Sequence, residues 1–112
     1  MEILYTEAFK RQLRRLSRKY RNIRSDLAPV IEKLKAGDIL GDQIPGVDYT
    51  LYKMRVRNRD AQRGTQGGYR LIYYLKTAEQ IVLITVYSKS DQSDIDAHRI
   101  REIIAAFEAA RK

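Results

Sequence analysis

Two segments near the amino terminus alternate apolar and polar residues at helical spacing. A short apolar run at 2–5 predicts a first strand, and Thr6 is the expected N-cap of a helix with Glu7 in its first turn. The apolar stripe of this helix is Phe9, Leu13, Leu16 and Tyr20. Lysines and arginines fill the positions between, so we expect an amphipathic helix with a basic outer face.

A second helix is predicted before Gly37, which fits a helix stop. Asn22 or Ser25 could begin it, and we favour Ser25, because Pro29 is tolerated only near the first turn. Its apolar stripe is Leu27, Val30, Ile31 and Leu34. Residues 37–49, rich in Gly and Asp, are predicted to form a loop.

The second half of the chain changes to strand-like patterns. Residues 50–57 alternate, with Lys53, Arg55 and Arg57 on the face opposite Tyr52, Met54 and Val56. Residues 69–75 and 81–88 are rich in β-formers, and a last helix is predicted after Asp94 or Asp96.

The order strand, helix, helix, three strands, helix favours one α+β domain over residues 1–112. We expect a small antiparallel sheet packed by two amino-terminal helices and a carboxy-terminal helix. The helices should share one sheet face and leave the other partly open, with the basic residues on it.

The charge balance narrows the possible partners. Twenty-two Lys and Arg against fourteen Asp and Glu give a net charge of +8. Such a small basic domain favours a polyanionic partner, either nucleic acid or an acidic protein. There is no cysteine, no membrane-length apolar run and no signal-type amino terminus, so we expect a cytoplasmic protein without disulfides.

Metal and nucleotide chemistry are not indicated. With His98 as the single histidine, we expect no transition-metal site and no cofactor. The acids of 91–96 are predicted to cap the last helix rather than bind calcium. The glycines of 64–68 lack a phosphate-loop pattern, and we expect Gly67 and Gly68 to let the chain enter its strand past a crowded neighbour.

Cations on neighbouring strands are the best candidates for chemistry. Lys53 and Arg55, with Arg70 and Lys89 on the following strands, can converge on one face and bind RNA or DNA phosphates. The predicted RNA-binding side chains around them are Arg57, Arg59, Arg63 and Tyr74, with Tyr87 as a second candidate for base stacking. The alternative is a basic face that is merely exposed to solvent and has no binding function.

This constellation could also cleave RNA. A 2′-hydroxyl can attack the adjacent phosphate if a protein positions the nucleotide, stabilises the developing charge and moves protons. Lys53 could act as the base, because nearby cations disfavour its protonated form.

The runs "LYKMRV", "RGTQGGYRLIYYL" and "IVLITVYSKSDQSDI" together resemble toxins of the RelE/ParE superfamily, especially its RelE- and HigB-like branch. The resemblance implies a toxin of a type II toxin–antitoxin module with a compact α+β fold. RelE-like members are ribosome-dependent, metal-independent endoribonucleases that cut mRNA in the ribosomal A site, and an antitoxin protein neutralises them.

Residue by residue, the resemblance matches Arg70 to the arginine that contacts the scissile phosphate and Lys89 to a second phosphate-binding cation. Lys53 and Arg55 match the basic strand that supplies a proton acceptor and charge stabilisers. Ile95 lies near the place of a catalytic tyrosine in some relatives, and His98 matches poorly the histidine of others. Tyr87 is the remaining candidate for the general acid.

Two other functions stay open at this stage. A ParE-like toxin would poison gyrase by binding a protein, and a non-catalytic module would only bind RNA. The row of cations favours the ribonuclease, since a gyrase binder needs no phosphate-facing cluster. An acidic antitoxin segment, the ribosome and mRNA are the expected partners, with no membrane.

Overall fold

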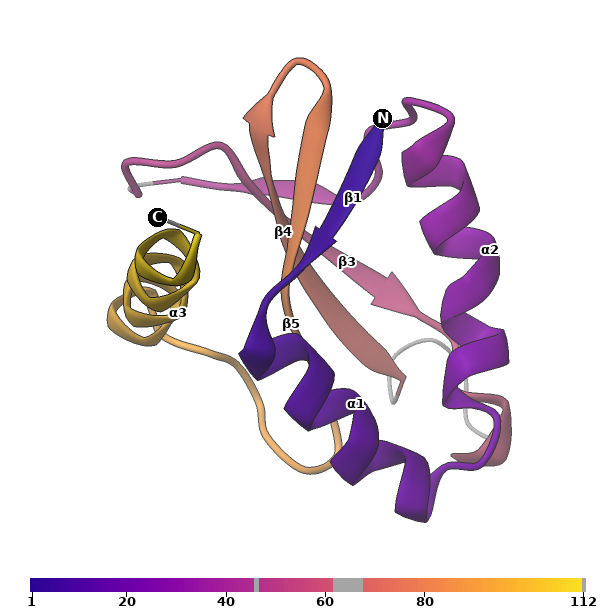
Figure 1. Ribbon diagram of the computed structural model, residues 1–112. Helices are drawn as coiled ribbons and strands as arrows, with labels where there is room; N and C mark the ends of the chain where they lie inside the picture. Colours follow the sequence, from indigo (N-terminus) through magenta and orange to yellow (C-terminus); the bar gives the residue numbers. More distant parts are fainter. Residues whose placement is uncertain (46, 62–67, 112) are drawn as a thin grey trace.

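The computed structural model describes residues 1–45, 47–61 and 68–111. Its centre is a five-stranded sheet in the order β1-β5-β4-β3-β2 (Figure 1). The strands are β1 (Glu2–Tyr5), β2 (Asp42–Ile44), β3 (Leu51–Val56), β4 (Tyr69–Thr77) and β5 (Gln80–Ser88). The α+β prediction is confirmed. The sheet is mixed rather than wholly antiparallel, because β1 pairs in parallel with β5.

The helix α1 (Glu7–Lys19) begins where its N-cap predicted. The backbone N–H of Phe9 donates to Thr6 Oγ1 at 2.9 Å, and that hydroxyl donates to the Ile84 carbonyl at 2.6 Å. A cap of this kind stabilises a helix by about 1 kcal/mol. Here it also ties the start of α1 to β5, at the centre of the fold.

The helix α2 (Ile23–Lys35) begins two residues earlier than predicted. Its start is held by Asp60, whose carboxylate accepts from the Asn22 backbone N–H and side-chain amide, both at 2.8 Å. Asp60 lies in the short 3₁₀ helix η1 (Arg59–Ala61), far away in sequence. This long-range contact explains why Pro29 ends up inside the helix despite the backbone bond it removes.

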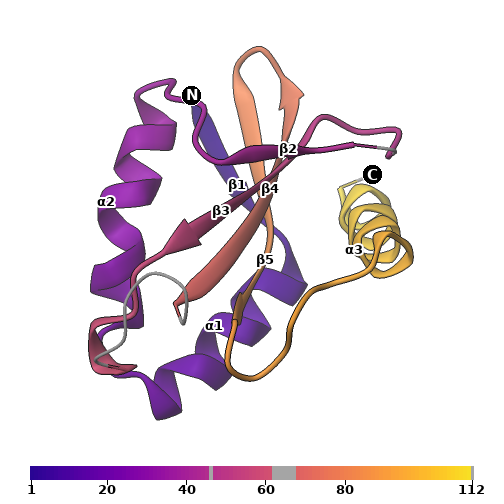
Figure 2. The same cartoon turned by 180° about the vertical axis from the view of Figure 1, so that it is seen from behind.

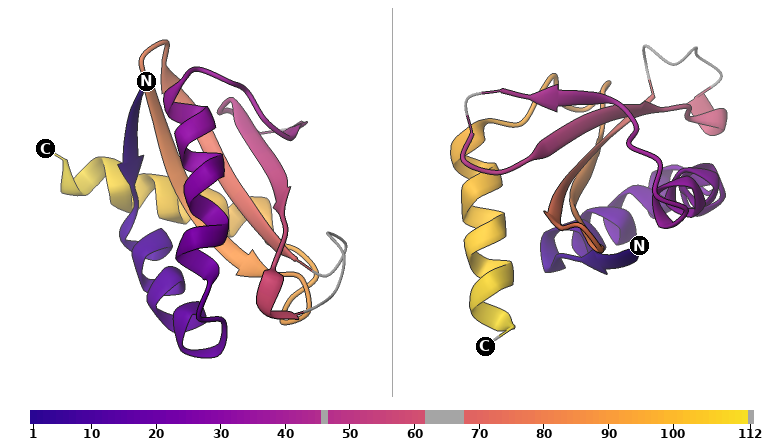
Figure 3. Two further views of the ribbon diagram at one scale, coloured as in Figure 1. Left: turned by 90° about the vertical axis from the view of Figure 1, so that its right-hand side faces the viewer. Right: turned by 90° about the horizontal axis from the view of Figure 1, so that it is seen from above.

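Two hydrophobic clusters lie on opposite faces of the sheet. On one face α1 and α2 pack over Leu71, Tyr73 and Leu83. On the other, α3 (Ala97–Ala110) packs over Ile72, Tyr74 and Val82 (Figure 3). The expectation that all helices share one face was therefore wrong. The apolar stripes indicate that each helix packs against the sheet, but they do not indicate against which face.

The edge strand β2 lies beside β3 in a segment predicted to be loop (Figure 2). It has three residues, too few for a periodic signal, and its Asp42 pairs with Lys53 in the register. Gly41 precedes it with φ +87°, and a Cβ there would lie 2.5 Å from the Lys53 carbonyl oxygen. The glycine thus permits the close approach that brings the 40–42 segment beside β3.

An irregularity in β5 decides which face its last residues occupy. Ile72 pairs with Thr85, whereas Tyr73 pairs with Leu83, so β5 has one extra residue at this point. In an uninterrupted strand Leu83 and Tyr87 would share a face. Because of this β-bulge, Leu83 faces α1 and α2 while Tyr87 faces the α3 side. Among the described residues, no helix is long and apolar enough for a membrane span.

Candidate functional site

Three candidate residues line up across the middle of the sheet. Arg55 on β3 pairs with Arg70 on β4, and Arg70 pairs with Tyr87 on β5. Cross-strand partners have side chains on the same face. The predicted alternation of β3 is confirmed, since Tyr52, Met54 and Val56 belong to the opposite cluster. Arg70, which lies inside β4, is only 7% exposed and donates to the Tyr69 carbonyl.

Four of the predicted cations surround one hollow, which lies beside the row formed by Arg55, Arg70 and Tyr87. The hollow measures about 670 Å³, is open to solvent, and is lined by Leu40, Gly41, Asp42, Lys53, Met54, Arg55, Arg70 and Lys89. Its cations come from β3, from β4 and from the residue that follows β5. The structure therefore brings together side chains from three separate segments, as the sequence predicted. A phosphate placed there would meet ammonium and guanidinium donors.

An acid that the sequence did not single out lies at the same site. Asp94 Oδ1 accepts from Lys53 Nζ at 3.1 Å, from the Tyr87 hydroxyl at 3.3 Å and from the Ile95 backbone N–H at 2.8 Å. The Ile95 N–H and the Lys53 ammonium hold the pKa of Asp94 below its ordinary value. Asp94 is therefore an anion at neutral pH.

The same contacts define the state of Tyr87 and Lys53. Burial raises the pKa of Tyr87 to about 12, and the Asp94 charge adds to the effect. Tyr87 is thus a neutral hydroxyl that can donate a proton. Lys53 Nζ donates to the Asp94 carboxylate at 3.1 Å, and a carboxylate partner favours the ammonium form of a lysine. The predicted role of Lys53 as a base stays a prediction, and this contact with Asp94 disfavours it.

The loop that carries Asp94 is held by hydrogen bonds just before and just after that residue. Lys89 Nζ donates to the Ser93 carbonyl at 2.6 Å, next to the Lys53 and Tyr87 contacts with Asp94. The helix cap that follows is formed by Asp96, whose carboxylate accepts from the Arg99 N–H at 2.8 Å. A helix needs one N-cap, so Asp91 and Asp94 of "DQSDID" were not needed for capping, and that surplus was the available signal for Asp94.

The remaining predicted RNA-binding residues differ in their surroundings. Arg57 is exposed just beyond β3. Arg59 forms an ion pair with Asp26 and donates to Ser25 Oγ at 2.8 Å, so its guanidinium is held against α2 rather than at the hollow. Arg63 lies outside the described residues, as does Gly67. Gly68 has the predicted crowded neighbour, since a Cβ would lie 2.3 Å from the Val56 carbonyl oxygen.

The predicted stacking role of Tyr74 does not fit the structure. Tyr74 is 3% exposed beneath α3 and donates to Glu108 Oε1 at 2.7 Å. Burial raises its pKa, and the Glu108 carboxylate adds to the shift. Its ring faces are covered, with Tyr49 packed edge-on at 5.6 Å between ring centroids. Strand periodicity indicated the face on which Tyr74 lies but not that α3 covers that part of it.

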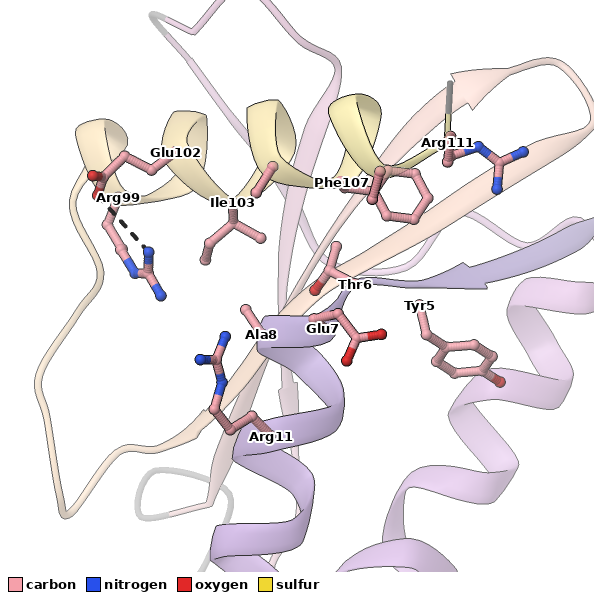
Figure 4. A pocket seen from close by; sticks show the side chains of 12 residues that line it. Tyr5, Thr6, Glu7, Ala8, Arg11, Arg99, Glu102, Ile103, Phe107 and Arg111 are labelled. Carbon is pink, nitrogen blue, oxygen red and sulfur yellow. Dashed lines mark ion pairs between the residues drawn. The ribbon is translucent and has the colours of Figure 1, made fainter.

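A second polar hollow of about 350 Å³ lies beside Tyr87. Tyr87 and Thr85 line it from β5, Arg11 from α1 and Arg99 from α3. Both arginines also border the adjoining apolar groove between α1 and α3, where Arg99 pairs with Glu102 at 3.8 Å (Figure 4). Positive charge therefore continues past Tyr87 toward the helices.

Metal-binding residues do not gather in the described part of the chain. No group of three or more His, Asp or Glu side chains is placed to hold an ion there. The side chain of His98 is 83% exposed at the start of α3.

Comparison with known protein families gives one match over nearly the whole chain. The family described as "RelE toxin of RelE / RelB toxin-antitoxin system" matches residues 1–111. The match spans every helix and strand of the fold and all the candidate residues discussed above.

Proposed function

Because the chain belongs to the RelE toxin family, and is thus a toxin of a toxin–antitoxin system, we propose that it is a ribosome-dependent endoribonuclease. Its substrate would be mRNA in the ribosomal A site, cut without a catalytic metal. The observation that carries the proposal is the in-register line Arg55–Arg70–Tyr87 beside the hollow lined by Lys53 and Lys89.

In the proposed reaction the 2′-oxygen of one nucleotide attacks the adjacent phosphorus, and the bond from phosphorus to the 5′-oxygen of the next nucleotide breaks. The products are a 2′,3′-cyclic phosphate and a 5′-hydroxyl. The 2′-hydroxyl proton passes to solvent, and Tyr87, kept protonated by burial, protonates the leaving 5′-oxygen. The base is assigned to solvent because Lys53 is already a donor to Asp94.

Arg55, Arg70 and Lys89 stabilise the charge that builds on the phosphate oxygens in this proposal. Donors held in place before the reaction are worth most, since they need no reorganisation. Arg70 is well suited to this role, because it is nearly buried in the central strand β4 and lies between Arg55 and Tyr87. Loss of one such donor typically costs on the order of 100-fold or more in rate.

The dependence on the ribosome is supported by the distribution of charge. The exposed side of α1 carries Lys10, Arg11, Arg14, Arg15, Arg18 and Lys19. Such a surface can hold a large RNA particle through its phosphates, while the small open hollow receives a single link of the message. A hollow this open gives little positioning alone, so we propose that the ribosome supplies the rest.

The family implies an antitoxin partner. We propose that an acidic segment of this antitoxin covers the cation hollow or the basic face of α1 in the neutral complex. Charge complementarity would speed association and make it sensitive to salt. Failure to co-purify with the product of the neighbouring gene at moderate salt would count against this assignment.

Expression in a bacterial host with mapping of mRNA 5′ ends tests the function. We expect codon-phased cuts that disappear in Arg70→Ala. The control is Arg101→Gln, an exposed change on α3 that also removes one positive charge. Growth arrest with DNA damage and intact message would contradict the proposal and point to gyrase instead.

A further inference from the structure

Asp94 connects Lys53, a cation of the hollow, with Tyr87, the proposed proton donor, across the sheet. Lys53 belongs to β3 and Tyr87 to β5, with β4 between them. Neighbouring strands are about 4.8 Å apart, so the two backbones are separated by roughly 10 Å. One carboxylate oxygen nevertheless accepts from both side chains, at 3.1 and 3.3 Å. Asp94 therefore bridges β3 and β5 above the central strand that carries Arg70.

We propose that Asp94 is a positioning residue that holds the Lys53 ammonium and the Tyr87 hydroxyl in place for RNA cleavage. This inference rests on the proposed function. The sequence pattern gave this acid only a possible helix-capping role, and the family match names no role for it. Its own position is fixed, since the Ile95 backbone N–H donates to the same oxygen at 2.8 Å and the adjacent Ser93 carbonyl is bound by Lys89.

A comparison with Asp91, three residues earlier in the same loop, shows what is particular to Asp94. Asp91 pairs with Lys19 of α1 at 3.2 Å. That contact is an ordinary exposed ion pair, a class that contributes little to stability. Asp94 instead contacts Lys53, which lines the cation hollow, and Tyr87, the proposed proton donor. The two acids therefore form a matched pair for experiments.

The charge of Asp94 has a second consequence, because a carboxylate beside a phosphate site repels the substrate. The lowered pKa of Asp94 means that this charge is present at neutral pH. Asp94 thus supports the rate while weakening the binding of RNA. Removing it should slow cleavage and tighten binding at once, a combination that loss of fold cannot produce.

The test measures cleavage on programmed ribosomes and, separately, the binding of a short RNA with 2′-deoxyribose at the cut position. For Asp94→Ala we expect kcat to fall by about 10- to 100-fold, since small misplacements of catalytic groups have effects of this size. The Kd for the uncleavable RNA should fall roughly threefold. Asp94→Asn keeps an acceptor oxygen without the charge, so it should restore part of kcat and keep the tighter binding.

Asp91→Ala is the control and should keep kcat and Kd within about twofold, as exposed changes usually do. If Asp94→Ala does not fold, the kcat and Kd of Asp94→Asn alone test the proposal. The proposal would be overturned if the Asp94 variants had the kcat of the wild type or cleaved faster. It would also be overturned if they cleaved more slowly and bound the RNA more weakly. A wild-type protein that binds the RNA but cleaves no message would instead overturn the ribonuclease function, and the Kd comparison would still test the charge effect.

Discussion

Arg55 and Arg70 lie directly opposite each other on β3 and β4. Like charges at such positions destabilise a sheet, yet Arg70 is almost buried at this place. The pair is thus unfavourable for folding, and in the proposed reaction it would serve to bind a phosphate. A site that binds an anion is expected to carry this kind of local cost.

The change Arg55→Thr separates the two effects. It removes the charge opposite Arg70 and introduces a good strand former, so we expect the free energy of unfolding to rise by about 0.2–1 kcal/mol. Cleavage should fall on the order of 100-fold with the loss of a charge-stabilising donor. Urea denaturation and the ribosome assay measure these quantities. A variant that is less stable and fully active would refute both expectations.

Tyr87→Phe tests the proton donor. The ring is 2% exposed and packs in the α3-side core, so the phenylalanine should keep the fold. Loss of the hydroxyl should lower cleavage by about 100-fold or more, the usual size of a general-acid effect. Single-turnover cleavage reports the rate, and circular dichroism checks the fold. Unchanged cleavage in a folded variant would remove Tyr87 from the mechanism.

Glu108 on α3 predicts how stability depends on pH. Its carboxylate accepts from Lys76 at 2.6 Å and from Tyr74 at 2.7 Å, and these donors lower its pKa from the ordinary 4.5. A lowered pKa in the folded state stabilises the fold above about pH 4.5, and this contribution is lost as the pH falls through the folded value. Glu108→Gln should therefore flatten the acid side of the stability profile.

Denaturation by urea at several values between about pH 3 and pH 7 measures this effect. The control is Glu102→Gln on the same helix, where the acid pairs only with exposed side chains. If the free energy of unfolding of Glu108→Gln falls with decreasing pH as steeply as that of the wild type, the contacts of Glu108 with Lys76 and Tyr74 do not stabilise the attachment of α3.

Gly68 links backbone packing to the site. A Cβ there would meet the Val56 carbonyl oxygen at 2.3 Å, and the Gly68 carbonyl accepts from the Lys89 N–H at 2.9 Å. We expect Gly68→Ala to cost about 1–3 kcal/mol and to displace Lys89, with reduced cleavage. Gly37→Ala, strained only by φ +98°, should cost about 1 kcal/mol without affecting cleavage. Thermal unfolding and the ribosome assay compare the two, and equal cleavage by both variants would argue against the link.

Local chemistry made parts of the structure predictable. Thr6 has a hydroxyl that caps a helix, and Lys53, Met54 and Arg55 alternate with the strand period, so the sequence alone indicates both features. The convergence of Arg55 and Arg70 followed from pairing adjacent strands. Each of these predictions depends on neighbours in the chain or on the simplest antiparallel pairing.

The features that escaped prediction depend on contacts distant in sequence. The start of α2 at Ile23 is set by Asp60, and the burial of Tyr74 is set by α3 on the second sheet face. The bulge in β5 gives no sequence signal, although it alone turns Tyr87 toward Arg70. Asp94 was hidden among acids suited to capping, and only the folded loop brings it to Lys53.

The most direct measurement of the central claim is the chemistry of the RNA ends. Ribosomes carrying a defined message in the A site would be mixed with the purified wild-type protein or with folded Arg70→Ala. The account predicts codon-phased cuts that leave 2′,3′-cyclic phosphate and 5′-hydroxyl ends with the wild type and no cuts with Arg70→Ala. Intact message with the wild-type protein, cuts with other ends, or equal cutting by Arg70→Ala would contradict it.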